Sequence, residues 1–101
     1  VLTPAAPDSI KAMIARGDAM QPTVSDGDLI WVDVSIKTPT SDGLYLFALK
    51  GEVFVKRLQL DNFNHSAAII SDNPLYPPIG ISKPDKLSTL GKVISVTKIY
   101  R

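Results

Sequence analysis

The sequence predicts a mostly β domain, compact and built from short, largely antiparallel strands. Three observations lead to this prediction. Short apolar segments alternate with polar residues at the two-residue period of a half-buried strand. Turn-forming Gly, Pro, Asn and Asp residues separate these segments at intervals of about ten residues, as is typical of small all-β domains. No window of about twelve residues shows the periodicity of an amphipathic helix.

The strands follow one another in a simple order. The segment 44–49 and the segment 52–60 are separated only by Lys50 and Gly51, which predicts a hairpin with a two-residue turn. The segment 71–78 carries three prolines, which cannot donate to a strand ladder, so we expect an ordered loop there. The predicted strands are 10–15, 28–35, 44–49, 52–60, 66–71 and 90–100.

The last predicted strand, 90–100, is long, and apolar residues occupy both of its alternating faces, including Val93 and Ile94. Because strands near a chain end often lie at a sheet edge, where unpaired backbone groups accept a partner, we expect this strand at an edge. The surplus of apolar residues predicts that it joins two copies of the chain in a dimer or a higher homo-oligomer.

Composition bounds the class of protein. The 101 residues are 45% hydrophobic and carry a formal net charge of +1, which suits one domain with a real core and gives no basic surface for nucleic acid. We expect a linker remnant at 1–9 and the domain itself at 10–101. With no cysteine, no apolar run long enough to span a bilayer and no signal peptide, we expect a cytoplasmic protein without membrane contact.

Two segments suggest the chemistry of a site. Residues 17–23 read Gly-Asp-Ala-Met-Gln-Pro-Thr, and Lys56 lies in the predicted strand 52–60. Gly17 allows a tight turn, after which backbone N–H groups near Asp18 and Met20 can face a developing oxyanion. Alternation places Lys56 between Phe54 and Leu58 on one strand face, where burial would lower the pKa of its amine toward that of a general base, while Arg57 would point to solvent.

Together these segments resemble the LexA/CI-repressor/UmuD superfamily of self-cleaving Ser–Lys proteases over positions 10–100. That superfamily reads Gly-x-Ser-Met-x-Pro-Thr around its nucleophile, and Ala19 stands here at the serine position. The resemblance implies a LexA-like fold containing a β-clip and assigns the general base to Lys56, near the Ala19 methyl carbon. It also places Asp18 and Met20 in the oxyanion loop. Peptidase activity is not expected while Ala19 lacks the attacking oxygen.

The resemblance most favours the C-terminal oligomerisation and self-cleavage domain of a phage-type repressor that controls lysogeny and SOS induction. It implies a homo-oligomer, a RecA filament or an antirepressor as partner, DNA contact only through an N-terminal domain, and a scissile bond upstream of this sequence. Two alternatives remain open: a naturally non-proteolytic module bound by an antirepressor, and a UmuD-like mutagenesis protein. Ala19 is either an engineered change or a natural one.

The remaining polar and aromatic residues have plainer interpretations. No phosphate loop, zinc-ligand spacing or dinucleotide fingerprint occurs, so we expect neither a metal nor a cofactor. The only histidine, His65, lies in a polar turn. Asp18 and Asp28 are expected to bond turn backbone. Trp31 suits either the core or an interface, and the proline-rich segment 74–78 either a stiff loop or a recognition surface.

Overall fold

The computed structural model describes residues 7–49, 51–81 and 88–100. A short 3-10 turn, η1 (Pro7–Ser9), leads into seven strands. The strands are β1 (Ile10–Ile14), β2 (Leu29–Asp33), β3 (Gly43–Leu49), β4 (Glu52–Asp61), β5 (Ser66–Ile70), β6 (Ile79–Ile81) and β7 (Ser88–Thr97). All pairings are antiparallel and form one sheet in the order β1-β2-β7-β3-β4-β5-β6. The mostly β fold class predicted from the sequence is therefore confirmed.

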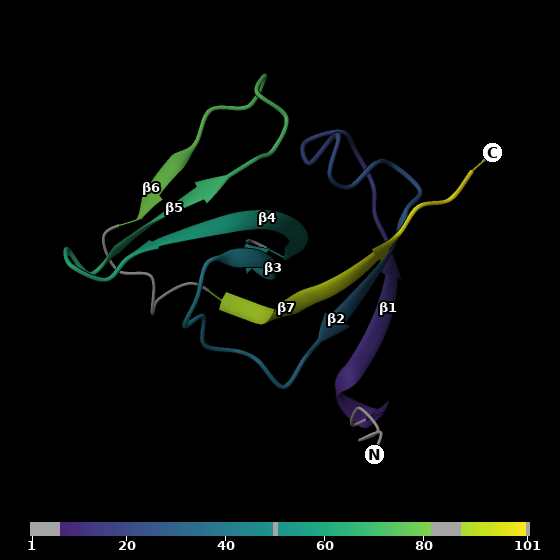
Figure 1. Ribbon diagram of the computed structural model, residues 1–101, viewed down its shortest axis with the longest axis horizontal. Coiled ribbons are helices and arrows are strands. Elements are labelled where there is room, and N and C mark those ends of the chain that lie inside the picture. Colours follow the sequence, from purple (N-terminus) through teal and green to yellow (C-terminus); the bar gives the residue numbers. More distant parts are fainter. Residues whose placement is uncertain (1–6, 50, 82–87, 101) are drawn as a thin grey trace, which may run out of the picture.

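The sheet is divided into two parts by the central strand β3 (Figure 1). Strands β1, β2 and β7 form one part, and β4, β5 and β6 form the other. The register between β3 and β4 pairs Leu49 with Glu52, so two residues connect them as predicted. Of those two, Lys50 lies outside the described residues, and Gly51 has a φ of +82°, which suits glycine.

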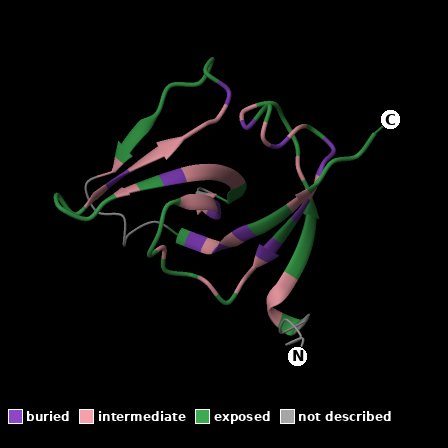
Figure 2. Cartoon of the chain, in the orientation of Figure 1, coloured by how far each residue is buried: buried purple, intermediate pink, exposed green. Residues whose placement is uncertain are grey.

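The core consists of two apolar clusters on opposite faces of β3, and the buried residues lie mainly on the strands and on the loop that carries Met20 and Val24 (Figure 2). Because side chains alternate along a strand, Leu46 enters one cluster while Tyr45 and Phe47 enter the other. A strand buried on both faces reads as a continuous apolar run, which explains the Leu-Tyr-Leu-Phe-Ala-Leu sequence of β3. The first cluster comprises Met20, Val24, Ile30, Val32, Leu46 and Val93, and the second comprises Tyr45, Phe47, Leu58 and Ala67.

The position of β7 differs from the prediction. It pairs with β2 on one side and with β3 on the other, so it is not an edge strand. The ladder with β2 skips Ile94, and the ladder with β3 skips Leu90, so each ladder contains a register shift. The shift at Ile94 changes the alternation, so that Val93 is buried and Val96 packs against the same cluster, while Ile94 is 51% exposed. Strict alternation along the segment 90–100 would place Val93 and Val96 on opposite faces, so the register shift overturns the alternation that the sequence predicts.

Two further differences concern short elements. β6 follows the proline-rich segment directly and pairs with β5 as an edge strand, and the sequence did not predict it. Its three residues include Gly80, which weakens any strand pattern. Within the described part of the chain, no helix has the length and apolar character needed to cross a membrane.

Candidate active site

A cleft of about 200 Å³ lies between β1, the loop that follows it, and β4. Ala19 and Lys56, the two residues that the sequence pattern paired, both line this cleft. Most other lining side chains are apolar, so a charged group inside it is poorly solvated. The lining residues are Met13, Ile14, Ala15, Arg16, Gly17, Ala19, Met20, Val24, Ile30, Leu46, Val53, Phe54, Val55 and Lys56.

The loop that carries Ala19 is held by its own backbone and by buried side chains. Gly17 has a φ of +88°, in the region that side chains disfavour, and its N–H donates to the Asp26 carboxylate at 2.8 Å. The Val24 N–H donates to the Met20 carbonyl at 2.9 Å, and both side chains are buried in the first cluster. Met20 therefore anchors the loop to the core through its side chain.

Lys56 lies near the middle of β4 and is partly buried. Its Nζ donates a hydrogen bond to the Ser71 hydroxyl at 2.8 Å and lies 5.7 Å from the centre of the Tyr76 ring. Burial lowers the pKa of the Lys56 amine below that of a free lysine, because the apolar surroundings disfavour the ammonium. This is the direction that a lysine acting as a base requires.

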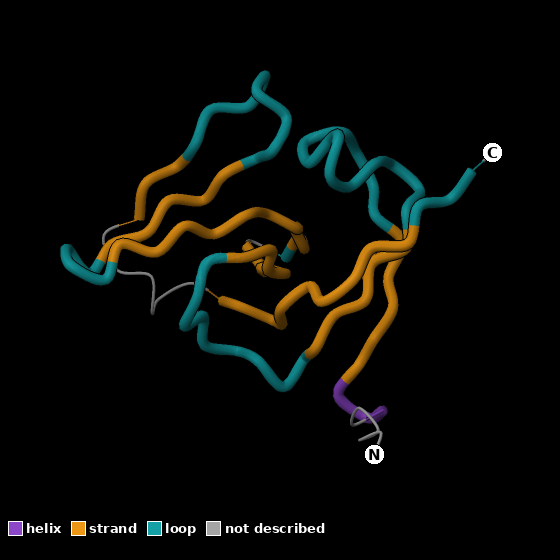
Figure 3. The backbone as a smooth tube through the Cα atoms, in the orientation of Figure 1, coloured by secondary structure: helices purple, strands orange, loops and turns teal. Residues whose placement is uncertain are grey.

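A second loop, residues 71–76 between β5 and β6, packs against the Ala19 loop (Figure 3). The backbone N–H of Asn73 donates to the Ala19 carbonyl, and its side-chain amide donates to the Asp18 carbonyl, both at 3.0 Å. Asn73 is only 8% exposed. The Tyr76 hydroxyl donates to the Asp18 carboxylate at 2.6 Å, so this carboxylate bonds a side chain of the second loop and not, as the sequence predicted, the backbone of its own turn.

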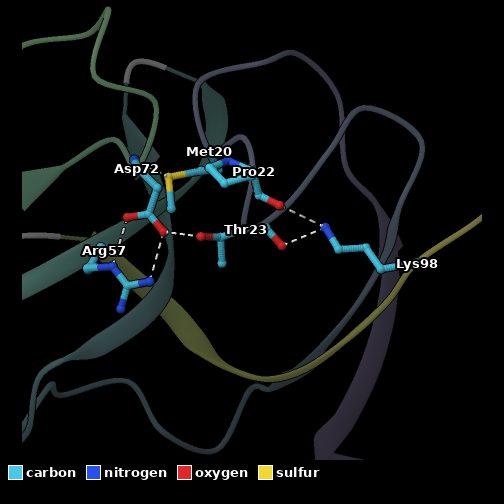
Figure 4. A network of polar contacts seen from close by, with 6 residues as sticks. All are labelled: Met20, Pro22, Thr23, Arg57, Asp72 and Lys98. Atoms are coloured by element: carbon cyan, nitrogen blue, oxygen red, sulfur yellow. Dashed lines mark hydrogen bonds and ion pairs between the residues drawn. The ribbon is translucent and has the colours of Figure 1, made fainter.

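Asp72 in the same loop joins β4 to the Ala19 loop (Figure 4). It accepts two hydrogen bonds from the Arg57 guanidinium, each at 2.8 Å, and one from the Thr23 hydroxyl. The Asp72 N–H also donates to the Met20 sulfur at 3.4 Å. Arg57 was expected to point to solvent; its side chain is 42% exposed, and its guanidinium also pairs with Asp72, which the sequence did not predict.

The chain after β7 is fastened to the far end of the Ala19 loop. The Lys98 ammonium donates to the Pro22 and Thr23 carbonyls and to the Asp28 carboxylate, the last at 2.7 Å (Figure 4 draws the two carbonyl bonds). Asp28 also accepts the Ser25 N–H, which fits its predicted role in a turn. The hydrogen bond from Lys98 is the main reason that the pKa of Asp28 lies below its usual value.

Of the site residues that the sequence predicts, Ala19, Met20 and Lys56 line one cleft, and Asp18 precedes Ala19 in the loop of that cleft. Sequence reasoning missed the roles of Ser71, Asn73 and Tyr76, although the Ser-Asp-Asn-Pro run at 71–74 is a strong turn pattern. Trp31 lies at the surface, 36% exposed, with its indole N–H donated to Thr97. Among residues 7–49, 51–81 and 88–100, no cluster of three or more His, Asp or Glu side chains can hold a metal ion.

The sequence is similar to known proteins along most of its length. A family model described as Peptidase S24-like matches residues 2–94. The 26 kDa repressor protein of Escherichia phage HK022 is 39% identical over 89 residues, which cover 86% of this chain and 37% of that protein. An uncharacterized HTH-type transcriptional regulator of Haemophilus influenzae is 33% identical over 92 residues, covering 88% of this chain and 38% of that protein. The chain thus spans well under half the length of these relatives.

Proposed function

This chain belongs to the Peptidase S24-like family, and from that premise we propose that it is the C-terminal oligomerisation and self-cleavage domain of a phage-type repressor, in a form without its nucleophile. The similarity to a phage repressor and to an HTH-type regulator identifies a repressor-type domain of this family. The observation that carries the rest is geometric: Ala19 and Lys56 line the same apolar cleft, on a tight loop and on the strand opposite.

The proposed chemistry is acyl transfer with lysine as the base. A serine oxygen at position 19 would attack the carbonyl carbon of the scissile peptide while neutral Lys56 accepts its proton. Lys56 would then return that proton to the departing amine, and water would release the acyl group. The loop N–H groups around Asp18 and Met20 would stabilise the oxyanion. Ala19 presents a methyl group instead, so the first bond cannot form in this chain.

In the intact repressor this domain would link DNA-binding domains without touching DNA itself. Holding two such domains together raises their effective concentration at paired operator sites, so self-association strengthens repression. We propose that the protein acts in the cytoplasm and maintains lysogeny. A RecA filament would promote cleavage in a serine-containing form, and cleavage would separate the two domains.

One alternative rests on a specific observation, namely Ala19 itself. If alanine is the natural residue, the domain is a non-proteolytic interaction module, and an antirepressor protein would relieve repression by binding it. A UmuD-like role in mutagenesis is less well supported, because one relative described above is named a repressor protein and the other an HTH-type transcriptional regulator. The codon at position 19 of the natural gene decides the origin of Ala19: a serine codon would mean that the alanine is engineered, and an alanine codon that it is natural.

The test restores the missing oxygen. Ala19→Ser, in a protein extended upstream through its natural linker, should cleave itself at high pH, where Lys56 is neutral. Mass spectrometry of the products between pH 7 and 10, with and without RecA filaments, measures the reaction. The Ala19 protein is the matched control, and adding Lys56→Ala should abolish cleavage. A serine-restored protein that stays intact under all these conditions would refute the self-cleavage function.

A further inference from the structure

The hydrogen bond between Lys56 and Ser71 follows from the sheet register. β4 and β5 pair so that Arg57 lies opposite Ile70, and the same register continues to place Ser71 opposite Lys56. The observed contact agrees with this, since the Lys56 Nζ donates to the Ser71 oxygen at 2.8 Å. Ser71 is therefore a direct cross-strand neighbour of the lysine that lines the cleft.

The position of Ser71 is also fixed relative to Ala19. The two residues that follow it, Asp72 and Asn73, bond Thr23 and the Ala19 carbonyl respectively. Asp72 is further held by Arg57 on the same strand as Lys56. One short segment thus contacts the strand of the proposed base and the loop of the proposed nucleophile.

A hydroxyl suits this position because of what a base must do. The Lys56 amine has to exist both as an ammonium, which only donates, and as a neutral amine, which also accepts. A serine hydroxyl accepts a hydrogen bond from the first and donates one to the second. A carboxylate there would favour the charged form, and an apolar side chain would leave the amine without a partner.

We propose that Ser71 is a positioning residue for Lys56, which keeps the lysine amine in one place at the cleft wall in both of its protonation states. The importance of this contact for catalysis rests on the proposed function, whereas the contact itself does not. Ser71 is not among the residues that line the cleft, so we do not assign its hydroxyl the role of the missing nucleophile.

Other groups around the lysine act on its charge in known directions. The Tyr76 ring face, at 5.7 Å, favours the ammonium, and the Tyr76 hydroxyl is occupied by Asp18. Arg16 lines the same cleft and disfavours a second positive charge. Arg57 and Asp72, which follow Lys56 and Ser71 in the sequence, carry opposite charges and form an ion pair, so together they add little net charge near the lysine. None of these groups can both accept from and donate to the amine as a hydroxyl does.

The first experiment uses the chain with Ala19 in place and follows the Lys56 titration by NMR of lysine labelled at the ε-carbon. Ser71→Ala should lower the midpoint of the titration, because the ammonium loses a charge-assisted hydrogen bond that is stronger than the one the neutral amine loses. Ser71→Thr keeps a hydroxyl and should restore the midpoint. Ser66→Ala, at the other end of β5, is the matched control and should leave it unchanged. An unchanged midpoint in Ser71→Ala would overturn the proposal.

The second experiment separates this proposal from the proposed function. In the serine-restored, upstream-extended protein, Ser71→Ala should slow cleavage by about tenfold to a hundredfold, since small misplacements of a catalytic group cost that much. Ser71→Thr should recover most of the rate. A rate indifferent to Ser71→Ala would overturn the positioning role. Complete inactivity of Ala19→Ser would instead refute the self-cleavage function, and the NMR titration would still decide whether Ser71 holds the lysine.

Discussion

At Asp72 three segments of the chain meet: its own loop, β4 and the Ala19 loop. Its carboxylate bonds Arg57 from β4 and Thr23 from the Ala19 loop, and its N–H donates to the Met20 sulfur. The side chain is 11% exposed, so these bonds replace most of its hydration. The Arg57 guanidinium is the main cause that holds the pKa of Asp72 below the usual value of an aspartate. The charge state of Asp72 therefore bears on the stability of the cleft.

Asp72→Asn should lower the free energy of unfolding by about 1–2 kcal/mol at neutral pH. This is at the low end of the contribution expected of a charged hydrogen-bonded pair, because water screens the partly exposed Arg57. A folded-state pKa below the unfolded value gives stability that is present above about pH 4 and is lost as the pH falls further. The difference between Asp72→Asn and the unaltered chain should therefore shrink below about pH 4. Urea unfolding at several pH values measures it.

A double-mutant cycle provides the control for this pair. Arg57→Met alone should cost a similar amount at neutral pH, and adding it to Asp72→Asn should cost little more, because the shared interaction is already lost. Fully additive effects, or a difference that persists unchanged at pH 3, would show that the pair does not stabilise the fold as described.

At the scale of single residues, the sequence predicted those that belong to a contiguous motif or to an alternating strand. Ala19 and Met20 lie within the run 17–23, and Lys56 lies in an alternating strand. The partners of Arg57 and of the Ala19 carbonyl were not predictable in the same way. They come from Asp72 and Asn73, about fifty positions further along than the Ala19 loop, and only the folded sheet brings the two loops together.

At the scale of elements, the largest difference from the prediction is that β7 lies inside the sheet, between β2 and β3. Proximity to the chain end predicts an edge, but β7 has these two neighbours and buries Val93 in the first cluster. The apolar residues on both faces of this segment predict an interface, but Leu90, Val93 and Val96 contribute to the first core cluster. The missed strand β6 has only three residues and follows two prolines, so alternation could not reveal it.

The close approach of β7 to β2 depends on Gly91. A Cβ atom added there would lie 2.5 Å from a Val32 methyl carbon and 2.8 Å from the Asp33 carbonyl oxygen. Both are fixed, one by core packing and the other by the backbone, so neither can give way easily. Gly91→Ala should therefore destabilise the domain by about 1–3 kcal/mol, as overpacking in a core does.

Gly80→Ala in the edge strand β6 is the matched control for that substitution, because its added Cβ would meet no atom within 4 Å. It should change the free energy of unfolding by less than about 0.5 kcal/mol. Guanidinium unfolding of both variants measures the difference. Equal stability of Gly91→Ala and Gly80→Ala would contradict the packing described between β2 and β7.

At the scale of the whole molecule, the exposed apolar residues decide how copies of the chain can meet. β7 lies between β2 and β3 in the sheet, and its residues 92–97 pair with β2 while its residues 88–92 pair with β3. Ile94 at the register shift is 51% exposed, and Trp31 on the adjacent β2 is 36% exposed. If copies of the chain associate through this part of the sheet, we expect these exposed apolar side chains to pack face to face.

Ile94→Asp should lower the mass of the domain measured by analytical ultracentrifugation at micromolar concentrations, because a charge would be buried in an apolar contact. The fold should remain intact, since Ile94 lies outside both core clusters. Val96 is unsuitable for this purpose, as it packs against the first cluster.

Phe63→Asp is the control for this measurement. Phe63 is 93% exposed in the turn between β4 and β5, remote in sequence from β7, and its replacement should leave the mass unchanged. An unaltered chain that sediments as a monomer at high micromolar concentration would remove self-association from the proposed function.

We propose that the Lys56 amine interacts with a side-chain oxygen or sulfur atom at position 19. A cysteine introduced there tests this interaction without substrate, RecA or an upstream segment. In Ala19→Cys the introduced thiol should titrate below about 8.5, the usual value for a cysteine, because a nearby ammonium favours the thiolate. The rate of alkylation as a function of pH measures this pKa. Adding Lys56→Met should return it toward the usual value. A thiol whose pKa is the same with and without Lys56 would show that the two positions do not form a dyad.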